Sequence, residues 1–162
     1  MGEIRIALLA DRHELIEEVG LLRWREWGAE DSVDSWIETT AREAGRTRLP
    51  ITLVAVGDDG AALGAVALGD RDDALEEAER RGRTPWLLGL VVRPAQRGSG
   101  VGRRLVSAIE DLARDRGHGQ LWVATGPQAV AFYARCGWLA DEELVLARGG
   151  WPTTILTRAL AD

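Results

Sequence analysis

Several residue types that build metal sites and covalent cross-links are scarce in this 162-residue chain. A single cysteine, Cys136, cannot form an internal disulfide or a thiolate cluster, and only His13 and His118 stand beside it, so we predict no metal. No segment approaches the roughly 20 apolar residues needed to cross a bilayer, and the start of the chain, MGEIRI, lacks the pattern of a signal peptide. We therefore expect a cytoplasmic protein without a membrane partner.

Lysine and asparagine are missing altogether, but the overall composition is that of an ordinary folded protein. Hydrophobic residues make up 46% and charged residues 28% of the chain, which excludes a disordered or collagen-like protein. A net charge of -6 argues against attraction of the whole protein to nucleic acid. The length predicts one domain, spanning residues 1–162.

Hydrophobic periodicity predicts strands that alternate with helices. The expected strands cover residues 4–9, 51–56, 61–68, 86–92, 121–124, 142–147 and 153–160. Helices are expected over residues 14–27, 32–44, 103–116 and 128–136, with Asp31 or Ser32 as the cap of the second. The highly charged segment 70–83 is predicted to be a solvated surface helix. This order indicates an α/β sandwich with a mixed sheet.

A glycine-rich loop follows the strand at 86–92 and precedes an amphipathic helix. Gly98, Gly100 and Gly102 let the backbone approach a ligand closely, and the helix N-terminus favours phosphate. Four arginines strengthen this preference: Arg93, Arg97, Arg103 and Arg104. The alternative is a loop in which glycines only satisfy turn geometry. Neither a P-loop nor a dinucleotide fingerprint fits, because Arg103 and Arg104 follow the last glycine and no acidic residue stands near Trp122.

Two motifs together resemble the GNAT acetyltransferase superfamily. The first, RGSGVG at 97–102, resembles the family's cofactor motif, and the second, AVAFYARCGW at 129–138, resembles its closing helix. The resemblance implies a GNAT-like mixed central β-sheet flanked by helices on both faces. It also implies an N-acetyltransferase that uses acetyl-coenzyme A (acetyl-CoA) and a primary amine of a small molecule or peptide, and a possible homodimer.

The resemblance assigns roles to individual residues. The pantetheine arm of the cofactor is expected along Leu90, Val91 and Val92, and near Phe132. The pyrophosphate is expected on the backbone amides of the loop, which comprises Arg97, Gly98, Ser99, Gly100, Val101, Gly102 and Arg103. Tyr133, the only tyrosine of the chain, is expected to protonate the leaving thiolate.

Three matters stay open at this point. Family members often have an asparagine seven residues before the tyrosine, where this chain has Gly126, and Thr125 or Gln128 can supply that contact instead. The general base is unassigned among Asp70, Glu142 and Glu143. An inactive sensor that only binds acyl-CoA is the alternative function, and acidic segments favour a cationic acceptor.

Overall fold

The computed structural model describes residues 2–160, and the chain divides into two compact units. Unit 1 comprises Met1–Leu68 and Gly89–Ile109, and unit 2 comprises Gly69–Leu88 and Glu110–Asp162. Seven strands form a mixed sheet in the order β1-β2-β3-β4-β5-β7-β6. The sequence-based prediction of a mixed sheet flanked by helices is confirmed.

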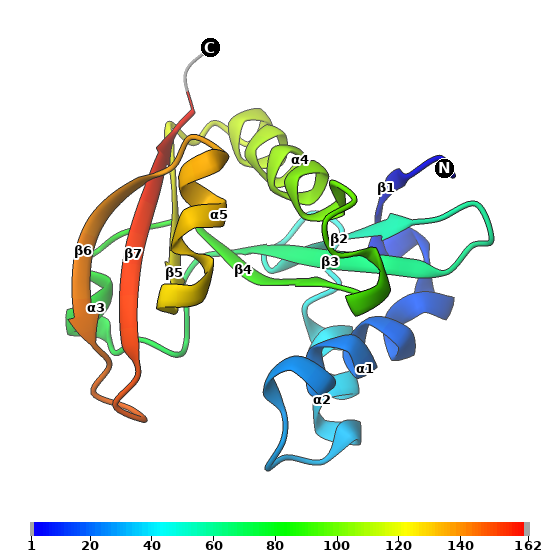
Figure 1. Cartoon of the computed structure of the whole chain (residues 1–162), viewed down its shortest axis with the longest axis horizontal. Coiled ribbons are helices and arrows are strands. Elements are labelled where there is room, and N and C mark those ends of the chain that lie inside the picture. Colours follow the sequence, from blue (N-terminus) through cyan, green and yellow to red (C-terminus); the bar gives the residue numbers. More distant parts are fainter. Residues whose placement is uncertain (1, 161–162) are drawn as a thin grey trace. The chain divides into compact units, whose positions relative to one another are not determined.

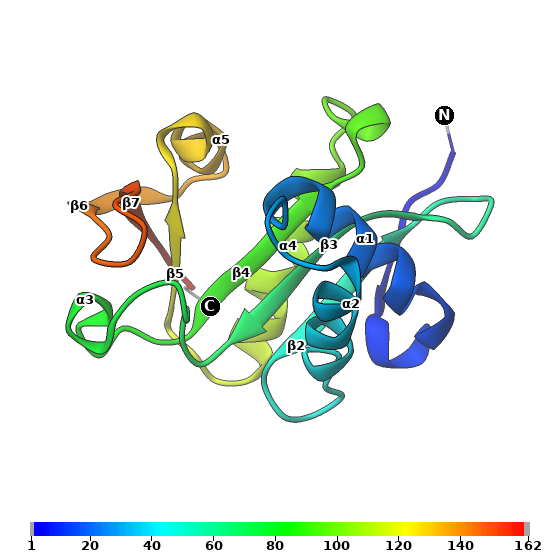
Figure 2. The ribbon, with the colours of Figure 1, turned by 90° about the horizontal axis from the view of Figure 1, so that it is seen from below.

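Unit 1 includes the antiparallel strands β1, β2 and β3, the helices α1 and α2, and the parts of β4 and α4 within residues 89–109 (Figures 1 and 2). Its elements are β1 (Arg5–Leu8), two short 3₁₀ turns (Leu9–Asp11 and His13–Leu15), α1 (Ile16–Trp27), α2 (Val33–Arg42), β2 (Ile51–Val56) and β3 (Ala62–Gly69). Both β2 and β3 are buried along their whole length. Such continuous burial is typical of strands at the centre of a sheet covered on both faces.

The core of unit 1 forms where α1 packs on the strands. Leu15, Val19 and Leu22 share one face of the helical segment and are almost fully buried. They cluster with strand residues that include Val54 and Val91. Of the two predicted caps of α2, Ser32 is the one observed, because its side chain accepts a hydrogen bond of 3.1 Å from the Ser35 N–H.

Unit 2 includes three strands and the two short helices α3 and α5 (Figure 1). Its elements are α3 (Glu77–Arg80), β5 (Gln120–Thr125), a 3₁₀ turn (Pro127–Ala129), α5 (Val130–Arg135), β6 (Leu139–Val145) and β7 (Pro152–Ala159). Strand β7 pairs antiparallel with both β5 and β6. Strand β6 begins three residues before the predicted strand, at Leu139.

The prediction for the charged segment 70–83 is wrong in part. Only Glu77–Arg80 is helical, and Asp73 forms an ion pair with Arg71 rather than supporting a longer helix. Leu75 is fully buried and clusters with Trp86, Leu146 and Ile155. A single apolar side chain therefore anchors the segment to the core of unit 2, which a charge pattern does not reveal.

Strand β4 (Trp86–Val92) leads into the glycine-rich loop and then into α4 (Val101–Asp115). The strand is parallel to β5, with Trp86 opposite Trp122. A 3₁₀ turn at Pro94–Gln96 separates β4 from the loop, and the amphipathic stripe of α4 is buried, as expected. Within residues 2–160 no helix is long and apolar enough to span a membrane.

Candidate active site

The second half of β4, which belongs to unit 1, has one buried face and one face that is only partly buried. Val91 is 5% exposed and belongs to the core cluster beside α1, whereas Leu90 and Val92 are only partly buried. Within the strand, Gly89 has a φ of 56°, in the left-handed region that favours glycine. The residues expected to face the pantetheine arm thus lie on a strand that is not fully covered.

The loop after β4 has the open backbone that its glycines predict. Gly98 and Gly100 have φ values of 83° and 90°, and a Cβ added at either would meet no atom within 4 Å. A left-handed conformation next to a helix start turns successive N–H groups toward one side. The backbone is therefore open at Gly98 and Gly100, whereas Gly102 already lies within α4.

Five N–H groups of this loop have no hydrogen-bond acceptor among residues 2–160. They belong to Gly98, Gly100, Val101, Gly102 and Arg103. The first bond of α4 runs from the Arg104 N–H to the Gly100 carbonyl, at 3.0 Å. Unpaired donors at a helix N-terminus carry partial positive charge and suit an anion such as phosphate.

The four nearby arginines differ in how available their guanidinium groups are to a phosphate. Arg93 donates to the Glu18 carboxylate and to the Ala62 carbonyl, so it ties the end of β4 to α1 and β3. Arg97 pairs with Glu26 at 3.1 Å, and Arg104 donates to the Ile4 carbonyl. Arg103 is exposed and has no partner in the described part of the chain. Arg103 is therefore the arginine most available to a phosphate.

Tyr133 lies on α5 in unit 2, within a group of three aromatic rings. Its side chain is only 4% exposed and packs edge-on against Phe132 and tilted against Trp138, with ring centroids 5.2 and 5.5 Å apart. Trp138 is held in turn by a hydrogen bond of 3.0 Å from its indole N–H to Glu110. The ring of Tyr133 is thus fixed by packing.

Burial raises the pKa of the Tyr133 phenol above its usual value, and the neighbouring Cys136 adds to the shift. Desolvation disfavours the phenolate because it penalises the charged form. The side chain therefore remains a protonated hydrogen-bond donor throughout the neutral pH range, as a general acid requires.

The ionisation of Tyr133 can be observed directly because it is the only tyrosine. We expect the tyrosinate absorbance of the folded protein to appear at distinctly higher pH than that of the denatured protein, which should titrate near pH 10. The unfolded chain releases this proton first, so the raised pKa stabilises the fold below about pH 10 and the stabilisation is lost at higher pH. Coincident titration curves for folded and denatured protein would contradict the burial of the phenol.

Gln128 occupies the space in which a side chain at Gly126 would stand. A Cβ placed on Gly126 would lie 2.6 Å from Gln128 Oε1 and 3.1 Å from Nε2. Gln128 is exposed and its amide makes no hydrogen bond within residues 2–160. Thr125, by contrast, lies within β5 opposite Thr154. Of the two candidates, Gln128 is therefore the one whose amide is shown beside Gly126.

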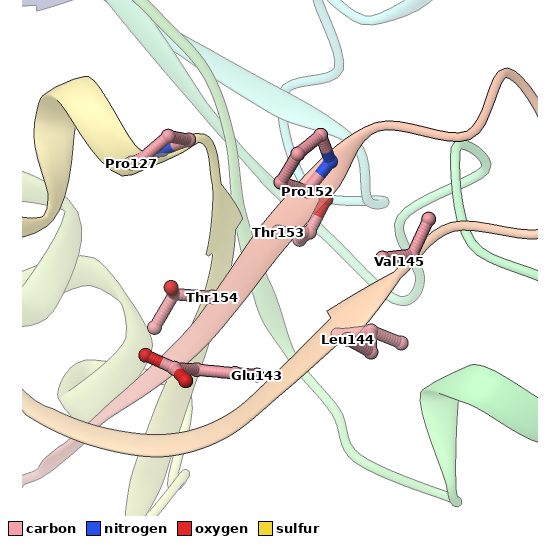
Figure 3. Close-up of a pocket in the computed structure, with 7 residues that line it drawn as sticks. All are labelled: Pro127, Glu143, Leu144, Val145, Pro152, Thr153 and Thr154. Carbon is pink, nitrogen blue, oxygen red and sulfur yellow. The ribbon is translucent and has the colours of Figure 1, made fainter.

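The three candidate carboxylates for a general base differ in their surroundings. Glu142 accepts a hydrogen bond of 2.7 Å from Arg83, so its charge is compensated. Asp70 is exposed at the end of β3. Glu143 lines a pocket of about 350 Å³ (Figure 3). The other lining residues are Pro127, Leu144, Val145, Pro152, Thr153 and Thr154. Glu143 is the only one of the three that borders this pocket.

Tryptophans gather at the corner between α1 and α2. The indole N–H groups of Trp24 and Trp36 both donate to Asp31, and the ring of Trp36 stacks on Trp27 at a centroid distance of 6.4 Å. Two of these three residues therefore fix the corner. Trp27, at 47% exposure, is the one with most surface left for a cationic ligand.

Sequence reasoning missed one polar residue, Arg23 of α1, which is 3% exposed. Burial lowers the pKa of its guanidinium, and the nearby Glu43 carboxylate opposes that shift. Arg23 stands four residues after Val19, on the same buried face of the helix. Helical spacing could have indicated that Arg23 is buried, but an arginine on an apolar face is easily assigned to the surface.

A model of the Acetyltransferase (GNAT) family matches residues 16–138. The chain is also 33% identical over 87 residues to glucosamine 6-phosphate N-acetyltransferase 1 of Oryza sativa subsp. japonica. That match covers 54% of this chain and 53% of the rice protein, so the chain spans about half the length of this curated relative.

Two solved structures resemble the chain over nearly its whole length. An aminoglycoside 6'-N-acetyltransferase complexed with coenzyme A has a TM-score of 0.76 and 20% identity, with 98% of each chain covered. A spermidine/spermine N-acetyltransferase from Vibrio cholerae has a TM-score of 0.69 and 15% identity, with 98% of this chain and 93% of the other covered. At these identities the likeness establishes the fold alone.

Proposed function

Because the chain belongs to the acetyltransferase (GNAT) family, we propose that it transfers the acetyl group of acetyl-CoA to a primary amine of a small molecule or peptide. The observation that carries this proposal is the set of five unpaired N–H groups from Gly98 to Arg103, at the start of α4. They form a site for the cofactor's pyrophosphate in the segment that matches the family motif.

The remaining cofactor contacts come from the strand before this loop and from residues after it. The pantetheine arm is proposed to lie along Leu90, Val91 and Val92 and to bond their backbone like an added strand. Phe132 packs near the arm. Arg97, Gly98, Ser99, Gly100, Val101, Gly102 and Arg103 hold the pyrophosphate. The amide of Gln128 makes the hydrogen bond to the pantetheine arm that the family's asparagine makes at the position of Gly126.

The chemical step is a direct attack within a ternary complex. The amine nitrogen forms a bond to the thioester carbon, the carbon–sulfur bond breaks, and coenzyme A leaves as a thiolate. Tyr133 donates its proton to that sulfur, while the amine loses a proton to a base. Glu143 is the proposed base, since Glu142 is neutralised by Arg83.

The related proteins named above support an amine acceptor. Their names specify a phosphorylated amino sugar, an aminoglycoside and a polyamine, which share an amino group and little else. We propose that this chain also acts as a single domain on such an amine.

The test is a thiol-release screen with acetyl-CoA and a broad panel of primary amines. Release of coenzyme A that depends on the amine, together with an acetylated product, is the expected result. Tight binding of acetyl-CoA without transfer to any amine would instead favour the alternative, an acyl-CoA sensor without activity.

A contribution of Gln128 to cofactor binding can be measured by calorimetry. We expect Gln128→Ala to weaken acetyl-CoA binding by roughly 3- to 10-fold, because one hydrogen bond is lost from an exposed site. Thr125→Val is the matched variant and should bind as the wild type does. If the two substitutions had equal effects, the assignment of Gln128 would be wrong.

A further inference from the structure

Arg23 has an edge of its guanidinium that no protein group uses. Its Nη1 donates to Thr40 Oγ1 at 3.4 Å and to Glu43 Oε1 at 3.1 Å. Its Nε and Nη2 are buried and have no hydrogen-bond partner among the described residues. These two nitrogens form the side of the guanidinium whose parallel N–H groups match two oxygens of a carboxylate or phosphate.

The unpaired edge faces β4 at Gly89, within unit 1. A Cβ added to Gly89 would lie 3.4 Å from both Nε and Nη2 of Arg23. A side chain at this position would lie in van der Waals contact with the unpaired edge, and the φ of 56° at Gly89 is in the left-handed region that favours glycine. The next residue is Leu90, the first of the three to which we assign the pantetheine arm.

Two donors on a buried cation that find no acceptor in the protein are costly. Each buried donor without an acceptor loses its hydration, and the loss is greatest for a charged group. Glu43 compensates the charge only on the opposite edge, and its side chain is 29% exposed. Such unsatisfied groups call for a functional explanation because most buried polar groups are paired.

We propose that the Nε and Nη2 edge of Arg23 binds the carboxylate or phosphate of an acceptor that also carries the reactive amine, in place of the purely cationic acceptor that the acidic segments alone suggest. This inference rests on the proposed acetyl transfer. The cofactor's phosphates are assigned to the loop that starts at Arg97, whereas the stretch from Gly89 to Val92 alone is roughly 10 Å long. The pantetheine arm and thioester carry no negative charge, so an anion at Gly89 comes with the acceptor. Because both nitrogens are shielded, a local opening precedes its binding.

The decisive experiment compares acceptors that differ only in an anionic group. Two such pairs are glucosamine 6-phosphate with glucosamine, and serine with serinamide. In the wild type, kcat/KM for the anionic member of the preferred pair should exceed that of its partner by roughly 10- to 100-fold. Arg23→Met should bring this ratio close to one, and Arg23→Lys should restore only part of it because lysine lacks the paired N–H groups.

Arg83→Met provides a control within unit 2. Arg83 is also largely buried and has one unpaired nitrogen, but it already binds the carboxylates of Asp141 and Glu142. This variant should leave the acceptor ratio unchanged. The proposal would be overturned if folded Arg23→Met kept the wild-type ratio of kcat/KM values. It would also be overturned if kcat/KM fell equally for anionic and neutral acceptors.

A binding measurement separates this proposal from the proposed function. Inorganic phosphate is titrated into protein saturated with coenzyme A, so that the glycine-rich loop is already occupied. Phosphate should bind the wild type and bind Arg23→Met at least about 10-fold more weakly. Equal binding would refute the anion site even if acetyl transfer were observed. Lack of transfer to every amine, with phosphate binding that depends on Arg23, would refute only the acetyltransferase activity.

Discussion

Tyr133→Phe should lower the rate of acetyl transfer by about 10²- to 10⁴-fold, the range that general acid catalysis contributes. The substitution removes only the hydroxyl group, so the packing of the ring against Phe132 and Trp138 is retained. Cofactor affinity should change little because the loop and β4 are untouched. The chemical step has to be followed in single turnovers, since slow product release would mask part of the loss.

Cys136→Ser is the matched control for this variant. Cys136 follows α5 directly, and its backbone N–H bonds to the Phe132 and Tyr133 carbonyls, so the control probes the same segment. Its single-turnover rate should stay within a few-fold of the wild type. Wild-type rates in folded Tyr133→Phe would show that solvent or another group protonates the sulfur, and the tyrosine would then have a structural role.

The conformation of the glycine-rich loop was predictable from sequence because it depends on local backbone geometry. Glycines at alternate positions permit φ values that other residues avoid, and an amphipathic stripe fixes where the following helix lies. Gly98 and Gly100 indeed have positive φ, and α4 begins at Val101. The same logic limited the cap of α2 to Asp31 or Ser32, of which Ser32 is the cap, since capping is decided within four residues.

Features that depend on contacts between distant segments were not predictable. Leu75 is one apolar residue among charges, yet Trp86 and Ile155 bury it. For the arginines, the sequence gives the charge near the loop but not the partners, and Arg93 proves to be bound by Glu18. Partner choice is a tertiary property, so residue type alone cannot assign it.

Gly100→Val should weaken acetyl-CoA binding by roughly 100-fold or more, which calorimetry can measure. The valine side chain would enter the open space at Gly100, where an added Cβ now meets no atom within 4 Å. That space is where the pyrophosphate is proposed to lie. Loss of two charge-assisted hydrogen bonds from the loop amides is enough for an effect of this size.

Strain is the competing explanation, because Gly100 has a φ of 90° and valine is disfavoured there. Gly60 separates the two causes: it has a φ of 84°, no atom within 4 Å of an added Cβ, and a place in the β2–β3 turn of the same unit. Gly60→Val should therefore lower the free energy of unfolding by a similar amount, about 1–3 kcal/mol, without weakening the binding of acetyl-CoA. If both variants bound acetyl-CoA equally well, the phosphate would not lie at Gly100. If both lost it equally, backbone strain in unit 1 would account for the effect, and the loop would need no direct contact with the pyrophosphate.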